Sequence, residues 1–175
     1  MTKRRILVVD DDKLMVAMLS DVLSADFDVV TAYDGDEGVE KVRSTQVVAV
    51  LSDQNMPTLS GVAVLTEALQ CQPQAVRILV TATDSVKDVA AATNQARVHR
   101  VVVKPFREVE ITGVVKGAIH EAELEEENRR LVSELQAAVA ELQEREAELE
   151  RELHARNEEL RLVINRVKSI EAGTG

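Results

Sequence analysis

The chain is 175 residues long, has a formal net charge of -10, and contains a single cysteine and three aromatic residues. A chain of this length accommodates one globular domain of about 100 to 150 residues together with an extension. Nucleic-acid backbones and anionic lipid surfaces both reward basic patches, which an acidic chain with few aromatic side chains does not offer. Binding to nucleic acid or to a membrane surface is therefore not expected as the main function of this chain.

The beginning of the chain and its cysteine predict a cytoplasmic location. The segment MTKRRILVVDDD reaches acidic residues too early for a secretory signal, and no run approaches the roughly 18 apolar residues that span a bilayer. Cys71 has no partner for an intramolecular disulfide, and its neighbours VLTEALQ predict a buried thiol without a catalytic role. The histidines lack the spacing of metal ligands, so they are expected to be structural or solvated.

Residues 5–106 alternate short apolar runs with longer helical patterns. The expected strands are 6–9, 29–32, 47–51, 78–82 and 101–103, and the expected helices are 13–24, 35–44, 61–70, 86–96 and one beginning near 108. The first, third, fourth and fifth runs are apolar without alternation, which is typical of parallel strands covered on both faces. We predict an α/β fold: a five-stranded, doubly wound parallel sheet of flavodoxin-like order 2-1-3-4-5, with its ligand site outside the carboxyl ends of strands 1 and 3.

Polar side chains follow four of the apolar runs. Asp10 and Asp11 follow ILVV, Asp53 follows VVAVLS, Thr81 follows ILV, and Lys104 follows VVV. If these runs are neighbouring parallel strands, the five side chains converge at one edge of the sheet. Carboxylates, a hydroxyl and an ammonium gathered there suit a divalent cation and a phosphoryl group. Clustered carboxylates repel one another, so we expect a raised pKa for at least one of them when no metal ion is bound.

Four strings occur in order and are separated by helix-sized gaps: VVDDD (8–12), SDQNMP (52–57), VTAT (80–83) and VVVKPF (101–106). Together they resemble the receiver domain of two-component response regulators, over residues 4 to about 118. The resemblance implies that a sensor histidine kinase transfers a phosphoryl group to Asp53 and forms an acyl phosphate, which is nucleophilic catalysis by a carboxylate. It implies a phosphoacceptor that promotes its own phosphotransfer and dephosphorylation, and not an enzyme.

The resemblance also implies Mg²⁺ as the cofactor. The implied magnesium site is formed by the carboxylates of Asp11 and Asp53, the backbone carbonyl of Asn55, and Asp10, which orients a bound water. Lys104 is implied to contact the phosphoryl oxygens, and the Thr81 hydroxyl is implied to bond to one of them after transfer.

The chain departs from the family at one position of the switch. Counting back from Lys104, the position where an aromatic residue is usual is occupied by Val101. We therefore expect phosphorylation to draw Thr81 inward while the helix at 88–96 and the strand at 99–103 repack by small shifts, without an aromatic rotamer.

From about Arg107 the composition changes to Glu, Leu, Arg and Ala, and no proline remains. One helix from Glu108 to Ile170 is the simplest interpretation, with a length of about 95 Å at about 1.5 Å per residue. Heptads counted from Val132 place ten apolar residues among twelve a and d positions, which predicts a coiled coil. We expect a receiver domain at 1–118 and a coiled-coil helix at 119–175 that continues the last receiver helix.

Two dimer arrangements of this helix remain open. In a parallel dimer Arg145 attracts Glu150 of the other copy, but Glu146 and Arg156 each face their own copies. By analogy with receivers whose C-terminal helices extend side by side, the parallel arrangement is slightly favoured.

In an antiparallel dimer centred on Arg151, Glu146 meets Arg156 instead, although Glu150 and Glu152 crowd their copies near the centre. The sequence alone does not decide between the two.

These patterns predict a phosphorylation-controlled response regulator that signals through its coiled-coil tail, by dimerisation or by binding a partner. The expected partners are a sensor histidine kinase, a second copy of the chain, and a protein that binds the face formed by residues 84–120. The alternative is that the chain is the receiver and linker of a longer signalling enzyme, such as a cyclic-dinucleotide enzyme, whose effector domain follows Gly175.

Overall fold

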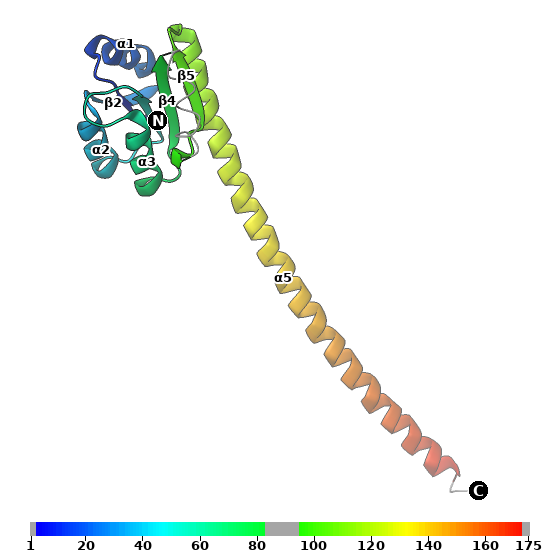
Figure 1. Cartoon of the computed structure of the whole chain (residues 1–175). Helices are drawn as coiled ribbons and strands as arrows, with labels where there is room; N and C mark the ends of the chain where they lie inside the picture. The colour runs from blue at the N-terminus through cyan, green and yellow to red at the C-terminus, as the bar shows by residue number, and fades with distance from the viewer. Residues whose placement is uncertain (1–2, 83–94, 173–175) are drawn as a thin grey trace. The chain divides into compact units, whose positions relative to one another are not determined.

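The computed structural model describes residues 3–82 and 95–172. Five parallel strands form one sheet in the order β2-β1-β3-β4-β5, as predicted (Figure 1). The strands are β1 (Arg4–Val9), β2 (Phe27–Ala32), β3 (Ala49–Asp53), β4 (Val76–Ala82) and β5 (Arg100–Lys104). The helices are α1 (Lys13–Ser24), α2 (Gly35–Ser44), α3 (Gly61–Cys71) and α5 (Glu108–Ala172). The helix predicted at 86–96 lies almost entirely outside the described residues.

Helices cover both faces of the sheet, and each face has its own apolar core. Ile6 and Val8 of β1 belong to the core beneath α1 and the first turns of α5. Leu7 and Val9 belong to the core beneath α2 and α3. Successive side chains of a strand point to opposite faces, so an uninterrupted apolar run such as ILVV is needed to supply both cores at once.

Strand β5 departs from the prediction that the fifth run is buried on both faces. Val102 is buried and packs in the core that contains Ile111 of α5. Val101 and Val103, on the opposite face, are 41% and 38% exposed. β5 is the edge strand, and among the described strands its neighbour is β4.

Polar residues fix the starts of three helices. Asp12 accepts a hydrogen bond from the N–H of Leu14 at the start of α1, and Asp34 accepts one from the N–H of Glu37 at the start of α2. Ser60 caps α3 in the same way by accepting from the N–H of Ala63. Each cap satisfies a backbone donor that has no partner inside the helix, so these residues determine where the chain turns from loop to helix.

The prediction of a buried Cys71 is wrong, because the thiol is exposed at the last residue of α3. Helical spacing places residue 71 on the same side of α3 as the buried Val64 and Ala68, so its exposure reflects its position at the end of the helix and not the face that it occupies. Its sulfur instead lies 3.2 Å from a carboxylate oxygen of Glu67, one turn earlier on the same face.

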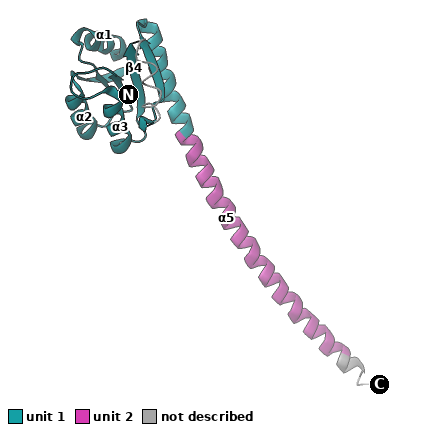
Figure 2. Cartoon of the chain, viewed as in Figure 1, with its two compact units in different colours: residues 1–125 teal, residues 126–175 magenta. Residues whose placement is uncertain are grey.

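The chain forms two compact units, residues 1–125 and 126–175 (Figure 2). Within the first unit, α5 buries Ile111, Val115, Ala118 and Ile119 against the sheet. Ion pairs attach the same part of the helix to its surroundings, and they join Lys116 to Asp26, Glu121 to Arg100, and Glu123 to Arg4. These contacts extend beyond residue 118, the predicted end of the receiver. The boundary at 118 itself stays a prediction.

The second unit is the distal part of α5, where the described side chains, through Lys168, are exposed. Among the residues described, no helix is long and apolar enough to cross a membrane. The one long helix predicted after Arg107 is confirmed, and it runs for 65 residues.

Candidate functional site

The register of the sheet brings the predicted site residues to one edge. Asp53, the last residue of β3, is aligned with Val80 of β4. The next residue of β4, Thr81, is aligned with Val103, and Ala82 is aligned with Lys104 at the end of β5. Because β1 and β3 are adjacent, Asp10, directly after β1, reaches the same edge.

Lys104 joins two of the carboxylates. Its ammonium nitrogen lies 2.8 Å from Oδ2 of Asp10 and 2.6 Å from Oδ1 of Asp53. The side chains of Asp10 and Asp53 are largely buried, and that of Lys104 is 23% exposed. These residues are 94 and 51 positions apart in the sequence, so the contact exists only because three strands end at the same edge.

Burial and pairing act in opposite directions on the two titrating groups of this cluster. Burial raises the pKa of Asp10 above its ordinary 3.8, although hydrogen bonds from Lys104 and from the N–H of Asp12 oppose the rise. The neighbouring charge of Asp53 adds to it. Burial alone lowers the pKa of Lys104, but the hydrogen bonds and charges of Asp10 and Asp53 outweigh that effect and raise it above 10.5. The expected rise in a carboxylate pKa is therefore found at Asp10, and its larger cause is burial, not repulsion between carboxylates.

The loop after β3 holds Asp53 in place. Oδ2 of Asp53 accepts a hydrogen bond of 2.7 Å from the N–H of Asn55. The N–H of Gln54 donates to the carbonyl of Val80 in the neighbouring strand, at 2.8 Å. At Gly61, an added Cβ would lie 2.2 Å from the carbonyl oxygen of Asp53, so only glycine allows the start of α3 to approach this closely. Gly61 was not predicted to be part of the site, although a glycine shortly after a site residue is a signal for close backbone approach.

Thr81 and Asp11 occupy different environments at the same edge. Thr81 is fully buried, and its hydroxyl donates to the carbonyl of Ala82 at 3.3 Å. Asp11 is exposed directly after Asp10 and is available to a ligand from solvent. The structure therefore brings Asp10, Asp53 and Lys104 into direct contact, and it places Thr81 and Asp11 at the same edge of the sheet.

The donor set at this edge fits a magnesium ion. Among the residues that the structure describes, no three or more His, Cys, Asp or Glu side chains form a group that could hold a metal ion. Mg²⁺ does not require such a cage, since it is usually held by one or two carboxylates, phosphate oxygens and waters. Asp10 and Asp53 are held close together by Lys104, and Asp11 and Asn55 lie beside them, so the required oxygen donors are present.

The fold and this site define a class of protein, and the comparisons with known proteins agree. The family model of the response regulator receiver domain matches residues 6–116, and the chain belongs to this family.

Two curated regulators and one solved structure illustrate the relationship. The chain is 30% identical over 133 residues to the hydrogenase transcriptional regulatory protein HoxA of Cupriavidus necator, a match that covers 76% of this chain and 28% of that protein. It is 36% identical over 119 residues to the transcriptional regulatory protein PrrA of Mycobacterium tuberculosis, which covers 67% of this chain and 51% of PrrA. A crystal structure described as adenylate cyclase from Rhodopirellula baltica superposes with a TM-score of 0.68 at 26% identity, over 75% of this chain and 98% of that one. The chain thus spans between a quarter and a half of the length of these two curated relatives.

Proposed function

We propose that this chain is a phosphorylation-controlled response regulator in which Asp53 accepts a phosphoryl group from a sensor histidine kinase. The contact of the Lys104 ammonium with both Asp10 and Asp53 is the observation that carries this proposal. It places a fixed positive charge beside a carboxylate that is held by a backbone N–H and remains partly accessible, which suits attack on an anionic phosphoryl group.

Each residue at the edge has a separate role in this proposal. An oxygen of Asp53 forms the new bond to phosphorus as the bond from phosphorus to the kinase histidine breaks, and the histidine leaves with the electron pair of that bond. Lys104 moves its contact from Asp53 to the phosphoryl oxygens. The Thr81 hydroxyl exchanges its bond to the Ala82 carbonyl for one to a phosphoryl oxygen.

Asp10, Asp11, Asp53 and the backbone carbonyl of Asn55 would hold Mg²⁺ in this proposal, with Asp10 acting through a bound water. When bound, the ion offsets the negative charge that develops on the transferring group. The labelling experiment that tests Asp53 as the acceptor also tests whether phosphorylation requires Mg²⁺.

Incubation with ³²P-labelled acetyl phosphate and Mg²⁺ tests the acceptor directly. Wild-type protein is expected to become labelled, and Asp53→Asn is expected to remain unlabelled while keeping the circular dichroism spectrum of the wild type. Asp28→Asn is the matched control, because Asp28 is an exposed aspartate of β2 far from the strand ends that form the site. Equal labelling of wild type and Asp53→Asn, or full labelling in excess EDTA, would contradict the proposal.

The tail is the proposed output. The seam of exposed apolar residues along distal α5 suits a coiled coil with a second copy, and phosphorylation would alter this assembly or the binding of a protein on the face at 84–120. We also propose that this receiver functions in the cytoplasm and that neither nucleic acid nor a membrane is its ligand.

A second candidate function follows from one of the comparisons. The structural neighbour described as adenylate cyclase is covered almost completely by this chain, so receivers of this shape occur in proteins with enzyme names. In this case the chain would be the receiver and linker of a longer signalling enzyme, and phosphorylation of Asp53 would control that activity. The complete reading frame decides between the two candidates.

A further inference from the structure

The distal part of α5 carries an uncovered apolar stripe. We call it the seam, defined as the a and d positions of the heptads that run from Val132 to Val167. Its apolar members are between 43% and 69% exposed, and they are Val132, Leu135, Val139, Leu142, Leu149, Leu153, Leu160, Val163 and Val167. Single exposed apolar residues are normal on protein surfaces. An apolar stripe that repeats over five heptads is instead typical of an interface that another helix buries.

A second copy of the same helix supplies a cover of sufficient size. Complete burial of one Val or Leu side chain removes roughly 60–120 Å² from water. Nine such residues on each of two helices bring the apolar area to the order of 1,000 Å², where stable interfaces between proteins begin. The seam is therefore large enough to hold a homodimer together.

Two charged residues interrupt the seam, and they decide the direction of the second helix. Glu146 occupies an a position and Arg156 a d position. In a parallel dimer each lies against its own copy, which creates two like-charge contacts inside the interface. In an antiparallel dimer centred on Arg151, each Glu146 lies opposite an Arg156, which creates two ion pairs at the same places.

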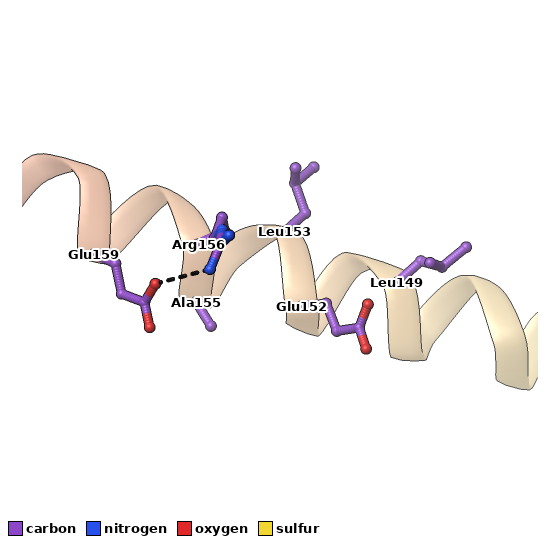
Figure 3. Close-up of a pocket in the computed structure, with 6 residues that line it drawn as sticks. All are labelled: Leu149, Glu152, Leu153, Ala155, Arg156 and Glu159. Carbon is purple, nitrogen blue, oxygen red and sulfur yellow. Dashed lines mark hydrogen bonds and ion pairs between the residues drawn. The ribbon is translucent and has the colours of Figure 1, made fainter.

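The residues at the edges of the seam contribute less to this choice. Arg145 pairs with Glu148 of its own helix at 2.7 Å, and Arg156 pairs with Glu159 at a longer 3.4 Å (Figure 3), so contacts of either arginine across the dimer must compete with a pair within the helix. Glu150 and Glu152, which would face their own copies in the antiparallel dimer, are exposed. Exposed charges are screened by water and salt, whereas contacts within the seam are closer and drier, so the seam contacts outweigh those at its edges.

A groove on the helix surface lies close to Arg151, the centre of the antiparallel arrangement. It is shallow and lined by Leu149, Glu152, Leu153, Ala155, Arg156 and Glu159. Leu149 and Leu153 point to the same side of the helix, while Glu152 points away from them (Figure 3). In the antiparallel register Leu149 of one copy meets Leu153 of the other, so these two leucines contact each other twice across the dimer.

We propose that a second copy of this chain covers the seam in the antiparallel direction, with Glu146 of each helix opposite Arg156 of the other. The proposal rests on the proposed function, which assigns the tail to dimerisation, and it names the orientation and the pairing residues. The orientation differs from the parallel one that family analogy favours, because the charges within the seam are specific to this chain.

Charge reversals in the full chain separate the two orientations. Glu146→Arg and Arg156→Glu each turn two ion pairs into like-charge contacts in the antiparallel dimer, so each is expected to raise the dimer Kd about tenfold or more. The double variant restores the pairs and is expected to return to within about threefold of the wild type. Glu144→Arg and Arg161→Glu are matched controls off the seam and are expected to leave the Kd unchanged. In a parallel dimer neither single reversal changes the number of like-charge contacts, so unchanged Kd values for both singles would overturn the proposal.

A distance measurement provides an independent test. A spin label on Ser133→Cys, in a Cys71→Ser background that removes the exposed native thiol, is expected to give an interlabel distance of about 54 Å in the antiparallel dimer, from 36 residues at about 1.5 Å each. A distance of about 20 Å or less, set by the spacing of adjacent helices and the label arms, would establish the parallel form and overturn the proposal.

Sedimentation equilibrium with and without beryllofluoride and Mg²⁺ completes the experiment. A dimer in either state agrees with the proposal, and a monomer in both states, or a trimer or tetramer, overturns it. Phosphate labelling of Asp53 on the same preparation reports on the receiver separately, so failure of this orientation is distinguishable from failure of the proposed phosphoacceptor function.

Discussion

His99 lies at the amino end of β5, away from Lys104. A hydrogen bond from the backbone favours the neutral form of its ring. Its Nδ1 accepts a hydrogen bond of 3.0 Å from the backbone N–H of Arg77, and the backbone N–H of His99 donates to the carbonyl of Arg77 at 2.8 Å. A ring nitrogen that accepts a hydrogen bond cannot take up a proton without losing that bond. Burial lowers the pKa of His99 below its ordinary 6.5, and the charge of Arg77 adds to the effect, opposed by Glu125 and Glu121.

The lowered pKa predicts a loss of stability in acid. Because the unfolded chain takes up this proton first as pH falls, the contribution of neutral His99 is present above 6.5 and is lost as pH falls towards the folded pKa. His99→Asn keeps a hydrogen-bond acceptor but does not titrate. Urea unfolding at about pH 7.5 and about pH 5.5 is expected to show a smaller loss of stability in the variant than in the wild type. Equal losses would mean that His99 does not sense this pH range.

Arg77 is a charged side chain in the interior of the receiver. It is only 3% exposed, and its guanidinium donates to backbone carbonyls of Pro73, Ala75, Ala96 and Arg97. Within the described part of the chain these carbonyls, and no carboxylate, are its hydrogen-bond partners. Arginine suits this position because its planar group presents several donors in fixed directions. No local pattern indicated this role, since RILV is typical of the start of a strand.

At the scale of elements, α5 changes its environment along its length. Its first turns bury Ile111 and Val115 under the sheet, while from Glu126 onward its described side chains are exposed. Gly113 and Gly117 lie on the outer side of the buried part, and an added Cβ at either would meet nothing within 4 Å. Neither glycine is therefore required by contacts within the chain.

Alanine at these two positions is expected to stabilise the receiver. Gly113→Ala and Gly117→Ala should each raise the free energy of unfolding by roughly 0.5–1 kcal/mol, because alanine loses less backbone entropy in a helix. Gly61→Ala is the contrasting variant, since its Cβ would meet the Asp53 carbonyl at 2.2 Å and must displace the backbone at the site. Urea titration monitored by circular dichroism checks all three. Destabilisation by Gly113→Ala or Gly117→Ala would show that the outer face of α5 has a tight contact.

In the part of the chain that the structure describes, the apolar cores of the receiver contain no residue of the tail. Both apolar cores consist of residues before Glu125, on β1 to β5 and the adjoining helices. The tail adds exposed apolar side chains but no buried ones among its described residues. The folding of the receiver should therefore not depend on residues after 125.

Truncation tests this separation. A chain ending at Glu125 is expected to unfold with a free energy within about 0.5 kcal/mol of the receiver transition in the full chain, because it loses no buried residue. A chain ending at Lys116 removes the buried Ala118 and Ile119 and is expected to be less stable by several kcal/mol, on the order of 2–5. Urea unfolding of both chains is the measurement. Equal stability of the two truncations would show that the helix contributes nothing beyond residue 116.

The parallel strands and the site edge followed from the sequence because both depend on local patterns, whereas the strand order was taken from the doubly wound topology. Uninterrupted apolar runs separated by helix-length segments specify parallel strands, and a polar residue directly after each run must lie at a carboxyl end. The environment of Cys71 was misjudged because apolar neighbours in sequence do not show where the helix ends, and the last residue of α3 is exposed. The exposure of Val101 and Val103 was missed because an edge strand and a central strand can have the same sequence pattern.

Local patterns were sufficient to predict the class of fold, the residues gathered at the sheet edge, and the long helix with its apolar heptads, because periodicity and strand-end positions are encoded locally. Other features depend on the packed structure: Lys104 joins Asp10 to Asp53, Gly61 lies against the Asp53 carbonyl, and Arg77 contacts His99 at the amino ends of β4 and β5. These contacts link residues between 8 and 94 positions apart, and their distances depend on the register of the strands and the packing of both cores, which no local pattern specifies.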